Sequence, residues 1–482
     1  MPLDTMGDAI AEMPGQAVPA IAGPATAGRL ALDPRTERLL EAPIAPLLLR
    51  LAWPNIAVML ITASTGLIET WWVSRLGLDA LAGVALVFPG FMMMQMLSAG
   101  AMGGGISSAV ARALGGGRRA DADALVLHAL IINVAIGGLF AALVLWFGPE
   151  LYRALGGEGG SLAAALAYSN IVFAGAPLVW LMNALASVIR GTGNMLVPAL
   201  AVSAGVALLV PLSPCLIFGI GPVPALGIAG AGIAVVATTA LTAAVLALYL
   251  ASGRAIVHFA WVRPRPRLFA DILRVGAVAS VSTLQTTLTV VLATGLVGAS
   301  AGPEAVAGYG TGNRLEYLIV PLAFGLGAPL VALVGTNLGA GRRERALRIA
   351  FTGAALAFVL AEAIGLAAAA SPETWLGLFS DDAAMHATGA QYLRIVGPAY
   401  GFFGMGLALY FASQGAGRLL WPLLAGLIRL VIAIGVGWIA LSLTGSLAWL
   451  FASLAFALVA YGMTIASAIG RGAWFARPRA RQ

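Results

Sequence analysis

The 482-residue chain contains no lysine and a single cysteine. Its 27 basic residues are therefore all arginine, a preference to which we attach no functional weight. Cys215 alone cannot form an intramolecular disulfide or a metal site made only of cysteines. The three histidines lie far apart and in no metal-ligand spacing. We therefore expect neither a metal site nor a bound cofactor.

Charged residues are also scarce. They make up 10% of the chain, against roughly 25% in soluble domains, and the mean hydropathy is +0.95. This composition is typical of a polytopic membrane protein. The net charge of +7 would suit nucleic acid, but the arginines cluster in short loops between apolar runs, where orientation in a membrane explains them better. We expect the lipid bilayer, and no nucleic acid, as a partner.

Long apolar runs recur along nearly the whole chain. A helix needs about 20 apolar residues to cross the hydrocarbon core, so the Gly, Pro and charge clusters between the runs predict about twelve helices and an all-α polytopic fold. They are placed at 46–73, 80–112, 123–147, 161–186, 194–218, 227–251, 270–299, 304–338, 345–369, 386–413, 420–443 and 447–470. Residues 1–43 lack the features of a signal peptide and are predicted to form a flexible N-terminal tail.

Arginines are distributed unequally between the two sets of loops. One set is strongly basic and includes both chain ends, whereas the alternate set holds few arginines and many of the acids. The positive-inside rule therefore predicts a multi-pass protein of the cytoplasmic (inner) membrane with both termini in the cytoplasm. Both termini on one side require an even number of spans, which supports twelve.

An internal repeat relates the two halves of the chain at an offset of 224 residues. The matches are 113–119 with 337–343, 190–194 with 414–418, Pro198 with Pro422, Tyr168 with Tyr392, and 49–51 with 273–275. The offset predicts two homologous six-helix bundles, at 44–251 and 270–470, with a basic cytoplasmic linker at 252–269 and a basic tail at 471–482. Because six is even, the bundles are parallel and can rock about a central cavity within a monomer.

Several short motifs, many of them rich in glycine, occur one after another along the two repeats. They are "WPNIAVML", "ETWWVSRLG", "ALAGVAL", "ARALGGGRR", "RGTGN", "PLSPCLIFG", "GAGIA", "LVGTNLGAGRRERA" and "SQGAGR". In their order and spacing the chain resembles the multidrug and toxic compound extrusion (MATE) family, from about residue 44 to 470. The resemblance implies a secondary antiporter, not an enzyme, that exports amphipathic, often cationic small molecules in exchange for H⁺ or Na⁺.

Glu69 is the first candidate for ion coupling. Family members carry an acid eight residues before the glycine of the "R-L-G" turn, and counting back from Gly77 gives Glu69. A charge at the centre of a membrane helix costs roughly 2.5–3.5 kcal/mol, so a buried carboxylate would hold a proton and release it when its cavity opens to water. Helical spacing places Thr62, Thr65 and Trp72 on the same face, as candidate cavity residues. The alternative is an anchor at the outer interface, close to Arg75.

The chain departs from the family pattern at two helices. In the fifth, Pro211 and Ser213 stand where the family commonly has Asn or Asp, which puts the usual cation network of that half in doubt. The seventh has no acid after Asp271, only Gln285 among serines and threonines. Gln285 is therefore a candidate for a polar cavity wall, although such hydroxyls also bond readily to their own backbone.

Glu316 is the second candidate for ion coupling. Tyr309 and Asn313 share its helical face, and a carboxylate beside an amide would bind a cation or a positively charged drug. The alternative is a structural ion pair of Glu316 with Arg314 or Arg429.

Arg429 lies too deep in the eleventh predicted span to be a loop charge. It therefore needs a carboxylate partner, for which Glu316 and Glu362 are available.

Three rival functions remain. A flippase for lipid-linked oligosaccharides or polysaccharide precursors would share the fold, but it should line its cavity with several basic residues, whereas deep arginines are few here. A membrane enzyme of prenyl or phosphoryl transfer would need paired acids for Mg²⁺, and no span contains them. A channel is disfavoured because the repeat gives two bundles and no ring of filter loops.

Overall fold

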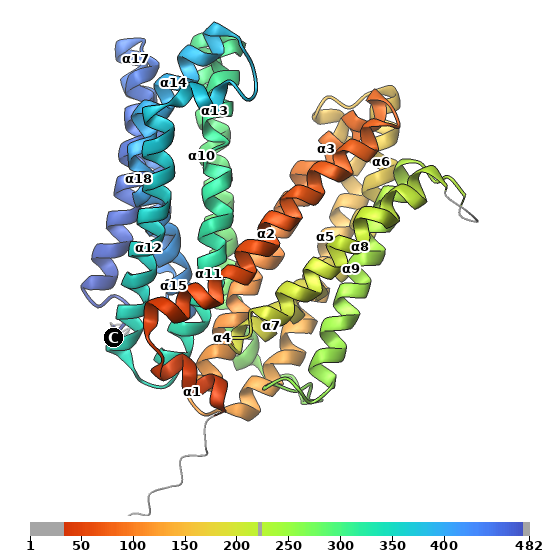
Figure 1. The fold of residues 1–482 in the computed structure, drawn as a ribbon, viewed down its shortest axis with the longest axis vertical. Helices are drawn as coiled ribbons and strands as arrows, with labels where there is room; N and C mark the ends of the chain where they lie inside the picture. Colours follow the sequence, from red (N-terminus) through yellow and green to blue (C-terminus); the bar gives the residue numbers. More distant parts are fainter. Residues whose placement is uncertain (1–32, 220–223, 476–482) are drawn as a thin grey trace, which may run out of the picture.

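The computed structural model describes residues 33–219 and 224–475, all of whose regular elements are helical (Figure 1). One lobe, here the N-lobe, contains α2 (Ile44–Ser74), α3 (Leu78–Gln95), η1 (Met96–Met102), α4 (Gly103–Gly115), α5 (Arg119–Ala154), α6 (Gly159–Ala174), α7 (Ala176–Gly191), α8 (Leu196–Phe218) and α9 (Ile228–Ala251). The C-lobe contains α10 (Pro266–Asn313), α11 (Glu316–Gly339), α12 (Arg343–Ala370), α13 (Pro372–Leu376), α14 (Ala383–Val396), η2 (Gly397–Ala399), α15 (Tyr400–Ala416), α16 (Leu420–Leu430), η3 (Val431–Val436), α17 (Gly437–Thr444) and α18 (Leu447–Gly470).

The predicted number of membrane spans is confirmed within the described part of the chain. Eleven helices there are long and apolar enough to cross a membrane, and α6 with α7 makes a twelfth if this pair, bent by 45°, is one span. α10 continues through the predicted boundary near residue 300, but Gly302 interrupts it with φ +79°, a left-handed conformation that favours glycine. The predicted boundary between the seventh and eighth spans therefore coincides with this break in α10.

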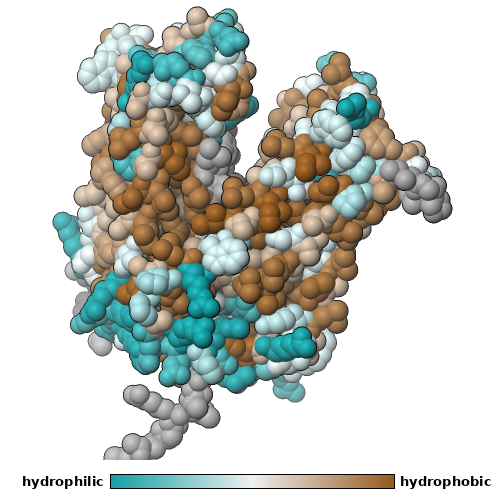
Figure 2. Space-filling model, viewed as in Figure 1, coloured by the Kyte–Doolittle hydropathy of each residue, from teal (hydrophilic) through white to brown (hydrophobic). Residues whose placement is uncertain are grey.

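The two lobes form a V (Figure 1). They meet at the closed end, which carries α1 (Pro34–Glu41) and the loops at 116–118, 192–195, 252–265, 340–342 and 417–419. They diverge toward the open end, where the helices of each lobe are joined by the alternate set of loops. A brown apolar band covers the middle of the visible surface in Figure 2, between teal regions at the two ends. This pattern is that of a protein surrounded by lipid at mid-height.

Glycines allow the two lobes to touch backbone to backbone at the closed end, where α4 crosses α11. A Cβ at Gly115 would lie 2.8 Å from Cα of Thr336, and a Cβ at Gly339 would lie 3.0 Å from Cα of Arg112. Residues 112 and 115 correspond to 336 and 339 at the offset of 224, so the two contacts are the same contact made twice about a two-fold axis. Small residues at helix crossings are the usual means of close approach in membranes.

Polar side chains close the same end across the lobes. Ser108 Oγ of the N-lobe donates to the carbonyl oxygen of Gln414 at 2.5 Å, and Arg112 Nη1 donates to that of Gly415 at 3.2 Å. Gln414 Nε2 donates in return to the carbonyl oxygen of Gly100 at 3.4 Å. These bonds satisfy backbone groups of one lobe with side chains of the other, so they are lost if the lobes separate at this end.

Residues 33–43 are not the flexible tail that the sequence predicted, whereas residues 1–32 of that tail lie outside the described residues. Asp33 caps α1 by accepting a hydrogen bond from the Arg35 backbone N–H at 2.9 Å. C-lobe side chains then hold the backbone after it, because Asn337 donates to the Leu39 carbonyl at 3.1 Å and Arg342 donates to the Leu40 carbonyl at 2.8 Å. α1 is therefore fixed to the closed end of the C-lobe.

Leu39→Ala is expected to destabilise the protein. Leu39 is 3% exposed and packs into the C-lobe core, and loss of a buried leucine side chain costs about 2–5 kcal/mol. Thermal denaturation of the detergent-solubilised protein should show a lower midpoint for this variant. Leu49→Ala is the matched control, since Leu49 is 49% exposed on α2 and should shift the midpoint little. Equal shifts in the two variants would contradict the docking of α1.

The linker 252–269 is folded onto the start of α5, and its last residues already belong to α10. The backbone N–H of His258 donates to Asp123 at 2.8 Å, and that of Arg265 donates to Nε2 of the buried His128 at 2.8 Å. Arg119 donates to the carbonyl of Ile256 at 3.0 Å. The connection between the lobes is thus fixed to the N-lobe by buried and charged groups.

Candidate functional site

Glu69 is half-buried near the open end of α2, where it faces α8. Ser213 Oγ donates to Glu69 Oε2 at 2.7 Å. The second carboxylate oxygen, Oε1, is buried and receives no hydrogen bond from the described residues. Tyr168 of α6 is close enough to interact electrostatically with the carboxylate. The serine that departs from the family pattern is thus the donor that holds this carboxylate.

The residues predicted to share a face with Glu69 have different environments. Trp72 lies near it and packs edge-on against Phe218, with ring centroids 6.1 Å apart. Thr65 is buried and donates to its own helix, and Thr62 is exposed. Arg75 lies 4.7 Å from the Trp71 ring centroid, and no ion pair joins it to Glu69 in the described chain. The structure gives Glu69 no cationic partner there, so it provides no support for a salt-bridge anchor.

A second buried acid lies inside the C-lobe. Glu316 Oε1 accepts a hydrogen bond from the Tyr392 hydroxyl at 3.0 Å, and the same hydroxyl lies 3.3 Å from Asn313 Oδ1. Glu316 Oε2 lies 3.9 Å from Arg429 Nη2, with both side chains largely buried. Tyr309 packs edge-on against Tyr392 at 5.2 Å. The predicted Tyr309, Asn313 and Glu316 are therefore together, and the ion pair is the one with Arg429.

Two residues proposed for that ion pair lie elsewhere. Arg314 is exposed, and its guanidinium lies 5.6 Å from the ring centroid of Phe379. Arg314 follows the end of α10 and Glu316 begins α11, and no ion pair joins the two in the described chain. Glu362 accepts a hydrogen bond from the backbone N–H of Gly401 at 2.7 Å, which joins α12 to α15. Of the alternatives left open by the sequence, the structure therefore pairs Glu316 with Arg429, and neither Arg314 nor Glu362 takes part.

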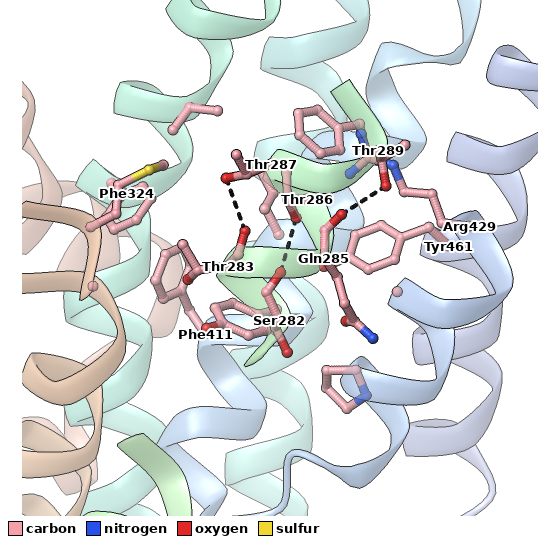
Figure 3. A pocket seen from close by; sticks show the side chains of 18 residues that line it. Ser282, Thr283, Gln285, Thr286, Thr287, Thr289, Phe324, Phe411, Arg429 and Tyr461 are labelled. Carbon is pink, nitrogen blue, oxygen red and sulfur yellow. Dashed lines mark hydrogen bonds between the residues drawn. The ribbon is translucent and has the colours of Figure 1, made fainter. Parts of the chain in front are cut away.

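A cavity lies where the C-lobe meets η1 (Figure 3). We call it the C-lobe cavity. Its lining is polar along α10 and mostly aromatic or apolar elsewhere: Met96, Gly100, Ser282, Thr283, Gln285, Thr286, Thr287, Thr289, Val320, Phe324, Phe403, Leu407, Tyr410, Phe411, Pro422, Gly426, Arg429 and Tyr461. The two π-helical segments adjoin it, because η1 supplies Met96 and Gly100 and η3 begins two residues after Arg429. Such segments are frequent at functional sites.

The hydroxyl groups of α10 already donate their protons in hydrogen bonds to the backbone. Thr286 and Thr287 each donate to the carbonyl oxygen four residues earlier at 3.2 Å (Figure 3), and Thr283 does so at 3.1 Å. Their lone pairs remain available to a ligand on this wall. Gln285 is 9% exposed, and its Oε1 receives no hydrogen bond from the described residues. The predicted polar wall therefore borders the C-lobe cavity and consists mainly of acceptors.

Sequence reasoning missed Tyr392 and Ser213 as partners of the two acids. A signal for Tyr392 was present, because the offset of 224 pairs it with Tyr168, and each tyrosine lies near the acid of its own lobe. Ser213 was noted because it stands where the family commonly has Asn or Asp, but no pattern paired it with Glu69.

The described helices form two lobes, each with an acid on an inward face, an arrangement typical of secondary transporters. The chain matches the MatE family over residues 54–215 and again over 277–439. It therefore belongs to the MATE family of transporters.

Two relatives match the chain at low sequence identity. The chain is 28% identical to an FAD transporter of Shewanella oneidensis over 397 residues, which cover 82% of this chain and 87% of the relative. It is 25% identical to a probable multidrug resistance protein, YoeA of Bacillus subtilis, with coverage of 72% and 76%.

Solved structures share the fold. One described as the outward-facing conformation of a multidrug resistance MATE family transporter has a TM-score of 0.82 and 24% identity, over 92% of this chain and 98% of that one. A MOP superfamily transporter from Pyrococcus furiosus matches with the same TM-score, identity and coverage, and its description reports a binding pocket of reverse polarity.

Proposed function

We propose that this protein is a proton-coupled antiporter that exports amphipathic aromatic compounds from the cytoplasm. The observation that carries the proposal is the Glu69 carboxylate, held in the N-lobe interior by one hydroxyl donor and, in the described chain, by no cation. A carboxylate in that position is costly when charged, so it exchanges a proton according to its access to water. The relative named as an FAD transporter supports export of a ring-containing molecule, and the relative named as a probable multidrug resistance protein supports export of drugs.

Alternating access follows from the V shape. The basic loops lie at the closed end, so the positive-inside rule places that end in the cytoplasm and the open end outside. In this state the C-lobe cavity is reached from the outside, where substrate leaves and protons enter. Rocking about the crossing of α4 and α11 would close the open end and open the basic one.

The proposal is tested with everted membrane vesicles containing the wild-type protein. A pH gradient and a Na⁺ gradient are imposed separately, and uptake of a cationic and of an anionic fluorescent dye is followed. We expect an acid interior to drive uptake of at least one dye and a Na⁺ gradient to drive none. A response to Na⁺ alone would overturn the proton assignment, and no response to either gradient would overturn antiport.

A further inference from the structure

The charged residues that line the C-lobe cavity are unusual for a site expected to bind cations. Arg429 is the one charged residue among the described residues that line it, and no carboxylate does so. Its nearest acid, Glu316, lies behind it in a neighbouring cavity that includes Tyr392 and Asn313. A positively charged ligand in the C-lobe cavity would therefore meet a guanidinium before it met an acid.

Arg429 is positioned to bind a ligand. It is 7% exposed, and its guanidinium lies 4.9 Å from the Phe403 ring centroid and 5.8 Å from that of Tyr461. It makes no hydrogen bond to the described residues, and its single ion pair involves only Nη2, at 3.9 Å. A guanidinium has five N–H donors in a rigid fork, so several remain for a ligand. Aromatic rings hold the group in place without using those donors.

The surrounding wall selects a flat molecule. Phe324 and Phe411 pack edge-on with centroids 4.8 Å apart, and Figure 3 shows both across the cavity from the α10 hydroxyl groups. Gly426, three residues before Arg429, leaves space that Gln285 borders, because a Cβ there would lie 2.7 Å from Gln285 Oε1. The polar acceptors of α10 then face one edge of a bound ring, and Arg429 faces another.

We propose that the C-lobe cavity binds aromatic acids: planar ring systems that carry a carboxylate, sulfonate or phosphate. This inference rests on the proposed function and names the charge of its substrate. The anionic group takes the free N–H donors of Arg429, and ring N–H or O–H groups donate to the hydroxyl and amide oxygens of α10. Charge-assisted, two-pronged contacts of this kind are the strong hydrogen bonds of arginine.

The same geometry assigns a role to Glu316. An anionic ligand competes with Glu316 for Arg429, so neutralising Glu316 strengthens ligand binding, and by reciprocity the ligand favours neutral Glu316. The groups that face Glu316 are Arg429 of α16, Tyr392 of α14, and Tyr309 and Asn313 near the end of α10, and Tyr400 of α15 donates a hydrogen bond to the Tyr392 hydroxyl. In an antiporter, binding of the proton must weaken binding of the substrate. Protonation of Glu316 would instead strengthen binding of an anionic substrate to Arg429. Glu316 therefore adjusts substrate affinity, and proton exchange is left to Glu69.

The test is equilibrium binding to the purified full-length protein in nanodiscs at neutral pH, followed by fluorescence anisotropy. Fluorescein is the anionic probe and rhodamine 123 the cationic one, and both contain the xanthene ring system. We expect fluorescein to bind more tightly than rhodamine 123 to wild type. Arg429→Gln should weaken fluorescein binding by about tenfold or more, and Glu316→Gln should strengthen it several-fold.

Ser442→Ala on α17, whose exposed side chain lies outside the C-lobe cavity, is the control and should leave the affinities unchanged. If Arg429→Gln proves unstable, the double variant with Glu316→Gln removes both charges and should lose the preference for fluorescein. Tighter binding of rhodamine 123 to wild type, or weaker fluorescein binding in Glu316→Gln, overturns the proposal. Because no ion gradient is used, these outcomes leave the antiport proposal standing, and failure of antiport in vesicles leaves the binding result intact.

Discussion

Glu69→Gln is expected to abolish uptake driven by a pH gradient in everted vesicles. Glutamine keeps the shape of the side chain and can still accept the hydrogen bond from Ser213, so the helix packing should survive. It cannot take up or release a proton, however, and the exchange cycle then lacks its carrier. Initial rates of dye uptake at equal protein content measure the effect.

Two companion variants make this result specific. Glu69→Asp retains an exchangeable carboxyl group and should keep part of the activity. Glu150→Gln removes an exposed acid, paired at 3.8 Å with Arg153 on the surface, and should behave as wild type. Unchanged pH-driven uptake in Glu69→Gln would exclude Glu69 as the proton carrier, whatever the behaviour of Glu316.

Gly339→Ala is expected to reduce transport strongly by preventing closure at the basic end. The added Cβ would press on the backbone of Arg112, which cannot move aside as a flexible side chain can. Overpacking of this kind costs about 1–3 kcal/mol, which corresponds to a factor of roughly 5–150 between two conformations. The population should therefore shift away from the state described here.

The shift is measured with one reporter cysteine. Cys215→Ala removes the native thiol, and Thr286→Cys places a new one in the C-lobe cavity. An impermeant maleimide applied from the open side should react more slowly when Gly339→Ala is present. Gly138→Ala is the control, because a Cβ there meets no other residue within 4 Å. Equal labelling rates in the two variants would show that the crossing does not control closure.

The sequence allowed most of the architecture to be predicted, because its apolar runs and loop charges are local signals. Most span ends were placed to within a few residues, although α5 extends seven residues beyond the predicted 123–147, and helix breaks at Gly302 and Gly175 coincide with glycines. α1 was missed because eight residues cannot span a membrane and the composition around it is that of a tail. Its start signal, Asp33 followed by Pro34, was nevertheless present.

The candidate site was only partly predictable. The cost of burying a charge singles out Glu69, Glu316 and Arg429 from the sequence alone. Their partners depend on which faces of distant helices meet: Ser213 is 144 residues from Glu69, and Tyr392 is 76 residues from Glu316. No local pattern encodes those pairings. The positive charge of the C-lobe cavity likewise depends on the tertiary structure, in which Arg429 lines the cavity and Glu316 lies behind it.

The contact between α4 and α11 is isologous, as in a symmetric homodimer. Each lobe offers the same patch, so Gly115 and Gly339 perform one function, and a substitution at either should have a similar effect. A surface that is complementary to its own copy can arise before the gene is duplicated and fused. A single six-helix chain carrying this patch could already pair with itself in parallel orientation, and fusion would then free each copy to change its interior, as Glu69 and Arg429 have done in different ways.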